Sequence, residues 1–429
     1  MRRSALWLVV LTSLCCVPAP VLADLDAYLK KPEPAYRWEK TGQRSVPGGT
    51  VYDLQMVSQT WQGIVWQHRL SIYRPDNVAN PRFCALLNTG GSGSKENDAL
   101  AMAVASRAGT LFAVLNNIPN QPLYGGKTED ALVVYTWLKY LETGDESWPL
   151  HFPMAKAVLK AMDTVQAFAR QNDMPAVGGF MVTGASKRGW TTWLVGASRD
   201  PRVKSIAPMV IDVLNVPAQL KHQLEAYGEP SEQVGDYTSA GLIPILQSPK
   251  GQKLLALEDP YSYRDRLTQP KLLILGTNDR YWTQDALNLY WDGLKGPKWV
   301  AYIPNSGHGL EDRTRVLATL SAFTHKSAIG ERWPSMSWRY GADGSATTLR
   351  VETDIPAVSA RLFRAAAATQ DFRDSRWTSE PMEGAGKLFT GRLSAPDAGY
   401  AAMYGELTYE LDGKTFTLTT QIRILAPRP

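Results

Sequence analysis

The chain has 429 residues, of which 44% are hydrophobic and 10% aromatic, enough to bury the core of one large domain and a smaller one. Its formal net charge is +5, without a basic cluster or stripe, so the sequence does not predict a nucleic-acid-binding surface. No group of His, Cys and Asp has the spacing of metal ligands, and no cofactor is implied.

The N-terminal segment, residues 1–23, has the layout of a secretory signal peptide. Two arginines precede an apolar run over residues 5–17, and Ala23 ends the segment. The run is too short to span a bilayer comfortably, so we expect cleavage after Ala23 and no stable membrane insertion of the mature chain. The protein should then be periplasmic or secreted. Cys84 would be its only remaining cysteine, which excludes an internal disulfide.

Strand and helix patterns alternate through the first three quarters of the chain. Residues 51–59 and 64–75 resemble an antiparallel strand pair. Short apolar runs typical of buried strands follow at 83–91, 110–117, 178–186, 203–212, 271–279 and 298–309. Helical patterns lie between them at 128–141, at 153–171, and from about residue 187. This alternation predicts an α/β fold with a mostly parallel sheet flanked by helices.

Two further regions complete the predicted organisation. A long connection without a clear strand, about 213–268, predicts a cap over a site in an α/β-hydrolase domain of residues 24–334. From about 335 the pattern changes to strands separated by turns, which predicts an all-β sandwich over residues 335–429. Aromatic residues in and after the cap predict an aromatic-lined cleft: Tyr227, Tyr237, Tyr261, Tyr263, Tyr281 and Trp282.

The stretch "FMVTGASKRGWTTWL", residues 180–194, contains the candidate nucleophile. Ser186 follows an apolar strand and opens a helix, as a hydrolase serine does, and Gly184 supplies unhindered backbone for a tight turn. Arg188, however, stands where a second glycine is usual. The alternative is that Ser186 is an ordinary helix-capping serine.

A candidate base and acid follow Ser186 in the chain order expected for a parallel-sheet hydrolase. Asp279 directly follows the strand-like residues 271–278 and His308 follows residues 298–307, so a Ser186–Asp279–His308 triad is predicted. His308 stands out among the five histidines because glycines flank it at a strand exit. Asp212 also ends a strand and remains the alternative acid, since either neighbouring strand end can supply the carboxylate.

The donors for the oxyanion are predicted to be backbone groups. The N–H of Lys187 is one, and Gly90 or Gly91 in the loop "NTGGSGS" is the other. This loop lacks the lysine spacing of a phosphate-binding loop, and no helix is expected to begin directly after it.

Several longer strings resemble the PhoPQ-activated pathogenicity-related protein family across almost the whole mature chain. They are "ADLDAYLKKPEPAYRWE", "WQHRLSIYRP", "SWPLHFPMAKAVLKAMDTVQAF", "VTGASKRGWTTWL" and "TQDFRDSRW". The resemblance implies an exported α/β-hydrolase-like protein with a link to virulence or cationic-peptide resistance. The family pattern carries Ser-Lys-Arg-Gly, so Arg188 belongs to its usual turn. This turn also resembles that of glucuronoyl esterases, which implies that the Lys187 ammonium faces the oxyanion or a substrate carboxylate. The alternative is that Lys187 points into solvent.

The sequence therefore predicts a serine hydrolase that cleaves an ester or amide of a small molecule or peptide. Two other classes remain open. One is a catalytically idle hydrolase fold that binds a peptide or an envelope component, and the other is a purely structural envelope protein.

Overall fold

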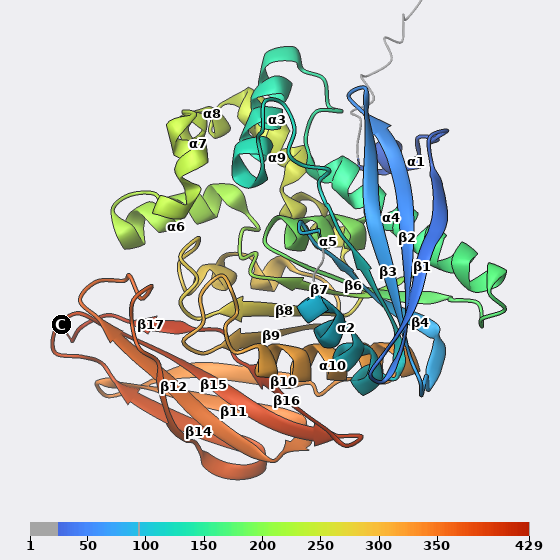
Figure 1. Ribbon diagram of the computed structural model, residues 1–429. Helices are drawn as coiled ribbons and strands as arrows, with labels where there is room; N and C mark the ends of the chain where they lie inside the picture. The colour runs from blue at the N-terminus through green and yellow to red at the C-terminus, as the bar shows by residue number, and fades with distance from the viewer. Residues whose placement is uncertain (1–24, 93–94, 429) are drawn as a thin grey trace, which may run out of the picture.

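The computed structural model describes residues 25–92 and 95–428, so the predicted signal peptide lies outside the described residues. Figure 1 shows a long twisted sheet with helices on its faces and, below it in that view, a second β layer from the C-terminal part of the chain. The short helix α1 (Leu25–Lys30) packs against α4 (His151–Gln171). Within the described ranges, no helix combines the length and apolar character needed to cross a membrane.

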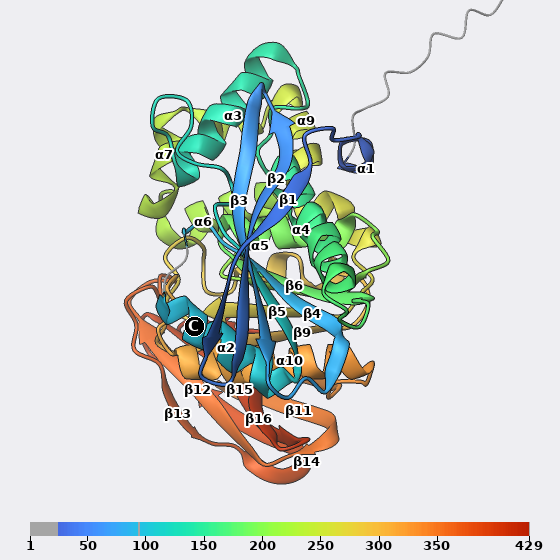
Figure 2. The same ribbon diagram turned by 45° about the vertical axis from the view of Figure 1, so that its right-hand side comes forward.

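The long sheet begins with three antiparallel strands and continues with six parallel ones. The antiparallel strands are β1 (Arg37–Val46), β2 (Gly49–Trp61) and β3 (Ile64–Pro75). The parallel strands are, in spatial order, β5 (Thr110–Leu115), β4 (Asn80–Asn88), β6 (Gly179–Ala185), β7 (Val203–Met209), β8 (Lys271–Gly276) and β9 (Lys298–Ile303). Every residue of β5 and β8 is buried, as expected for strands covered on both faces. Figure 2 shows the twist, with β1–β3 running across the direction of β6 and β9.

Helices cover both faces of this sheet. The helices α2 (Lys95–Ala108) and α10 (Arg313–Ile329) contact each other on one face, and α4 contacts α5 (Lys187–Ala197) on the other. Buried apolar residues form two core clusters, one containing residues of α4 and α5 and the other residues of α2 and α10. This arrangement confirms the predicted fold class, an α/β-hydrolase-like, mostly parallel sheet flanked by helices.

Helices form the connection between β7 and β8, where the sequence predicts a cap. They are α6 (Val216–Tyr227), η1 (Glu232–Val234), α7 (Gly235–Ser239), α8 (Leu242–Leu246), α9 (Pro249–Glu258) and η2 (Pro260–Arg266). Both α7 and α9 contact α3 (Glu129–Thr143), and η2 contacts α5. In Figure 1, α6, α7 and α8 lie above β7 and β8. Two single-turn helices, η3 (Ala286–Leu289) and η4 (Trp291–Gly293), follow β8.

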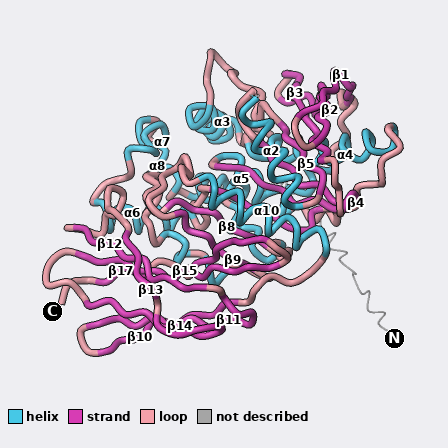
Figure 3. Tube along the Cα trace, turned by 60° about the horizontal axis from the view of Figure 1, so that its bottom comes forward, coloured by secondary structure: helices cyan, strands magenta, loops and turns pink. Residues whose placement is uncertain are grey.

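The C-terminal strands form two layers, which are visible at the bottom of Figure 3. One is a separate sheet of β10 (Met336–Asp343), β11 (Ala346–Ala357) and β14 (Glu383–Ser394). The other comprises β12 (Ser359–Ala367), β13 (Thr378–Pro381), β15 (Tyr400–Leu411), β16 (Lys414–Thr419) and β17 (Arg423–Leu425). This second layer is continuous with the long sheet, because Thr419 of β16 pairs with Val300 of β9.

The structure corrects several sequence-based expectations. The predicted N-terminal pair is a three-stranded unit that also contains β1. This strand was not predicted because it is mostly exposed and its sequence has no clear apolar pattern. The strand β10 was missed for the same reason. A helix, α2, does begin directly after the glycine-rich loop. The run 414–425 is two strands, separated by residues 420–422. At Thr420 the backbone N–H donates to the Gly405 carbonyl, but the Gly405 N–H donates to the Thr420 hydroxyl instead of a backbone carbonyl.

Candidate active site

Ser186 occupies a strained turn between β6 and α5. Its backbone has φ 57° and ψ −128°, a conformation that residues with a side chain rarely adopt. The turn is held from β7, because the Ser186 N–H donates to the carbonyl of Met209 at 2.9 Å. Although Ser186 precedes the first residue of α5, its side chain makes no capping hydrogen bond. The simple capping alternative is therefore wrong, and Ser186 lies, partly exposed, on a strained turn between a strand and a helix.

Glycines at positions 184 and 189, and not at 188, allow the close backbone packing around this turn. A Cβ on Gly184 would lie 2.6 Å from the carbonyl oxygen of Arg188. A Cβ on Gly189 would lie 2.7 Å from Cγ2 of Ile211 and 2.8 Å from the carbonyl of Met209. The close approach of α5 to β7 thus requires glycine at 189, and position 188 can carry a long side chain.

The loops after β8 and β9 bring Asp279 and His308 together. The His308 Nδ1–H donates to Oδ2 of Asp279 at 2.8 Å, and the other carboxylate oxygen accepts the backbone N–H of Tyr281 at 3.0 Å. The Tyr281 ring packs on the imidazole with 4.4 Å between centroids. The His308 side chain is 32% exposed and that of Asp279 is 13% exposed. The imidazole is therefore oriented by a carboxylate and still reachable by a substrate.

Ser186 and His308 together line two cavities. One, of about 60 Å³, lies under the cap between apolar and aromatic side chains that include Trp137, Trp190 and Val213. The other, of about 610 Å³, contains the glycine loop, with Thr89, Gly90 and Gly91, and extends to α10. The predicted nucleophile, after β6, and the predicted base, after β9, consequently face the same space although β7 and β8 lie between their strands.

The predicted oxyanion donors border this space as well. Lys187 is the first residue of α5, where backbone N–H groups have no partner inside the helix. The glycine loop is fixed by its neighbours, since Ile118 N–H donates to Thr89 and Asn117 N–H donates to Gly91, each at 3.0 Å. Residues 93–94 of this loop lie outside the described residues.

Asp212, the alternative acid, lies elsewhere in the site. It is buried and accepts a hydrogen bond from the Tyr290 hydroxyl at 2.6 Å. Burial raises the pKa of Asp212 to about 7, against the effect of the Tyr290 hydrogen bond, and the charges of Asp279 and Asp285 raise it further. The structure thus places Asp279, rather than Asp212, beside the imidazole.

A comparison with protein families identifies the chain. The model of the PhoPQ-activated pathogenicity-related protein family matches residues 25–373. The chain belongs to this family. It is also 30% identical over 444 residues to autocrine proliferation repressor protein A of Dictyostelium discoideum, covering 94% of this chain and 89% of that protein.

Solved structures show weaker likeness. Acetyl xylan esterase 1 from Thermoanaerobacterium sp. has a TM-score of 0.48 and 17% identity, covering 70% of this chain and 93% of that one. An S-formylglutathione hydrolase from Agrobacterium tumefaciens has a TM-score of 0.47 and 15% identity, and the match covers 68% of this chain and 99% of that one. A glucuronoyl esterase from Solibacter usitatus has a TM-score of 0.41 and 13% identity, and the match covers 69% of this chain and 87% of that one. These values are too low for any activity to be transferred.

The turn of Ser186, Lys187, Arg188 and Gly189 directs its first basic side chain inward. Lys187 is only 7% exposed, so it does not point into solvent. Its Nζ pairs with Asp130 at 2.9 Å and with Glu129 at 3.4 Å, both at the start of α3. Asp130 also accepts hydrogen bonds from the hydroxyls of Tyr281, at 3.1 Å, and Tyr237, at 3.2 Å.

Sequence reasoning missed Glu129 and Asp130. Two acidic residues at a helix start are common enough to pass as ordinary first-turn residues. Burial would raise the pKa of Glu129, but hydrogen bonds from Arg188 and Gln121 and the nearby charges lower it to about 2. The one signal in the sequence was that two adjacent acidic residues, Glu129 and Asp130, could pair with two adjacent basic residues, Lys187 and Arg188.

Half of the predicted aromatic lining is present in the capped cavity. Tyr237, Tyr281 and Trp282 line it. Tyr227 instead packs on Arg373, Tyr263 donates to a carbonyl of α9, and Tyr261 lies against Gly293. The position of an aromatic residue in the sequence did not show whether its ring lines the cavity, because that depends on how the helices of the cap pack.

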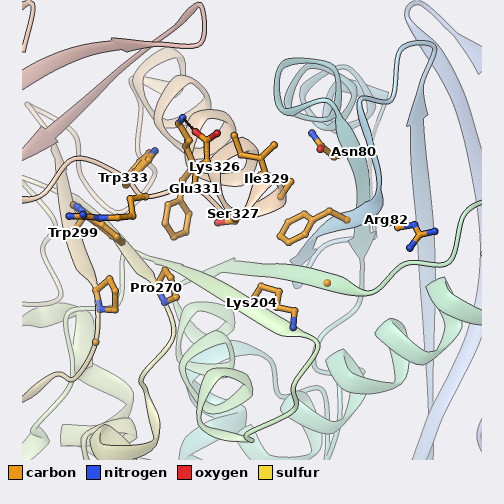
Figure 4. A pocket seen from close by; sticks show the side chains of 18 of the residues that line it. Asn80, Arg82, Lys204, Pro270, Trp299, Lys326, Ser327, Ile329, Glu331 and Trp333 are labelled. Atoms are coloured by element: carbon orange, nitrogen blue, oxygen red, sulfur yellow. Dashed lines mark hydrogen bonds and ion pairs between the residues drawn. The ribbon is translucent and has the colours of Figure 1, made fainter. Parts of the chain in front are cut away.

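A larger hollow lies away from these residues. Figure 4 shows this cavity of about 1190 Å³, which is lined by residues that include Arg82, Lys204, Trp299 and Trp333. It contains none of the predicted site residues. Across the described ranges, no group of three or more His, Cys, Asp or Glu side chains is placed to hold a metal ion.

Proposed function

We propose that this family member is a serine hydrolase in which Ser186, His308 and Asp279 form the catalytic triad. The observation that carries the proposal is the 2.8 Å hydrogen bond from His308 to Asp279 beside two cavities that Ser186 also lines. The positive φ of Ser186 supports the same role, because strained backbone of this kind is frequent at functional sites.

In the proposed reaction, His308 removes the Ser186 hydroxyl proton while Oγ attacks the carbonyl carbon of an ester or amide. The N–H of Lys187 and an N–H of Gly90 or Gly91 stabilise the oxyanion. The carbonyl re-forms, the alcohol or amine leaves with the proton from His308, and an acyl-enzyme remains. Water then attacks with His308 as the base, which releases the acid and regenerates Ser186.

The two cavities suggest how a substrate would lie. The polar groups on the capped side, Lys187 and Asp130, are already paired, so this side suits a small apolar group. The cavity beside the glycine loop has room for a larger leaving group. The predicted signal peptide supports activity in the periplasm or outside the cell, and the family's description as pathogenicity-related supports a link to virulence.

Labelling with a fluorophosphonate probe tests the function. Wild-type protein should be modified at Ser186, and Ser186→Ala should not be modified. Ser198→Ala is the matched control, because that hydroxyl caps the end of the same helix through Val195 and should have no role in attack. Screening against ester, peptide and acetyl-sugar panels would then define the substrate. An unlabelled wild-type protein would favour the binding-module alternative.

A further inference from the structure

A segment of the C-terminal region, Asp371–Trp377, lies against the active-site loops. It connects β12 to β13, two strands that belong to the sheet layer continuous with β9. The segment contains most of the string "TQDFRDSRW", for which the proposed chemistry has no use.

The first contact is with the loop that carries Asp279. The Asn278 side chain, directly before the acid, donates through Nδ2 to the carbonyls of Ser375 at 2.7 Å and Arg373 at 3.1 Å. On the other side of the acid, Gln284 donates to the Asp279 carbonyl at 3.1 Å. The same Gln284 amide accepts the backbone N–H of Phe372 at 3.3 Å.

The second contact is with the loop that carries His308. The Asn305 amide, three residues before the base, donates to the Trp377 carbonyl at 2.9 Å and accepts the Trp377 N–H at 2.8 Å. The indole of Trp377 is buried, so this end of the segment is anchored in the core. Asn305 has φ 54°, a conformation that asparagine tolerates better than most residues.

The third contact is with the cap. The Arg373 guanidinium lies 4.0 Å from the Tyr227 ring centroid and donates to Glu232 of η1. Glu232 also accepts from Arg280, which directly follows the acid. One short segment therefore touches the acid loop, the base loop and the cap.

We propose that Asp371–Trp377 is a positioning element of the active site, which holds the Asp279 and His308 loops at the separation that their hydrogen bond requires. Catalytic groups must be held within about 0.5 Å of the productive geometry, and loops at strand ends need support to reach this precision. The inference rests on the proposed function, and it makes the C-terminal region part of the hydrolase instead of an appended unit.

Two variants test the proposal. Asn305→Gly removes both side-chain hydrogen bonds to Trp377 and suits the positive φ. Asn278→Ala removes the bonds to the carbonyls of Arg373 and Ser375 in the middle of the segment. Arg376→Ala is the control, because its side chain is exposed within the same segment. We expect both loop variants to be labelled by fluorophosphonate about tenfold or more slowly, with kcat reduced and KM little changed, while the control matches wild type.

A second measurement does not depend on hydrolysis. The His308 Nδ1 proton should give a downfield NMR signal that is absent in Asp279→Asn. This signal should be lost or shifted in Asn305→Gly and Asn278→Ala and retained in Arg376→Ala, with thermal unfolding confirming that each variant is folded. If it moves in both loop variants while wild type is not labelled, the proposed function fails and the positioning role stands. If signal and labelling rate match wild type in both, the positioning role is overturned.

Discussion

Arg188 and Glu129 form a two-pronged ion pair, with Nη1 2.6 Å from Oε2 and Nη2 2.7 Å from Oε1. The guanidinium also donates through Nε to the carbonyl of Ile118, next to the glycine loop. A Cβ on Gly90 would lie 1.9 Å from Nη2 of Arg188. The basic residue in the turn thus supports the loop that we propose to stabilise the oxyanion, and this contact requires glycine at position 90.

Arg188→Lys should destabilise the protein although it keeps the charge. Lysine cannot reproduce the planar fork or the Nε donor. The loss should be about 1 kcal/mol, because the Glu129 side chain is 43% exposed and water screens the pair. Urea unfolding should show this loss, and labelling of Ser186 should slow because the glycine loop is released. The control is Arg332→Lys, where the side chain is 84% exposed and little change is expected. Wild-type stability in Arg188→Lys would contradict the supporting role.

Lys187→Met should lower both activity and stability. From the sequence alone, a fall in kcat/KM of about tenfold or more is expected, with little change in thermal stability for an exposed residue. The structure changes the second expectation, because Lys187 is buried and its loss leaves Asp130 without its cationic partner. A double-mutant cycle with Asp130→Asn measures the pairing. Additive effects on the free energy of unfolding would show that the two side chains do not interact.

Asp279→Asn should reduce kcat more than Asp212→Asn. An amide in place of Asp279 cannot hold the imidazole in the tautomer that accepts the serine proton. Asp212 makes its hydrogen bond to Tyr290, away from His308, and an amide oxygen can still accept that bond. Steady-state kinetics on the same ester decides the ranking. The reverse order would assign the acid to the end of β7.

Asp212→Asn should flatten the dependence of stability on pH. Burial raises the pKa of Asp212 to about 7, above its ordinary value near 4, so between these values the folded protein keeps a proton that the unfolded chain has released. The free energy of unfolding of the wild type should therefore fall as pH rises through this window, by about 1.4 kcal/mol per unit of pKa shift.

Unfolding in urea at about pH 5 and about pH 8 measures this difference. Asp259, whose pKa is also raised by burial, to about 6, contributes in the same direction in both proteins and cancels from the comparison. Equal pH dependence of wild type and variant would show that Asp212 does not titrate in this range.

The sequence by itself determined the features that depend on neighbours along the chain. Apolar runs located the parallel strands, and a long connection without a clear strand located the cap. The residues after three strands supplied the order Ser186, Asp279, His308. A serine on a strand-turn-helix and polar residues at strand exits are local patterns, so they can be read without knowing which strands are adjacent.

Only the tertiary structure decided how these pieces meet. The choice between Asp279 and Asp212 depends on which loop reaches the imidazole, and the partners of Lys187 and Arg188 come from a helix more than fifty residues earlier. The continuity of β9 with β16 and the contacts of Asn278 and Asn305 with Asp371–Trp377 also join residues distant in sequence. Such pairings are fixed by packing and hydrogen bonding in the folded chain, because a local pattern shows that a polar group needs a partner without showing which one it has.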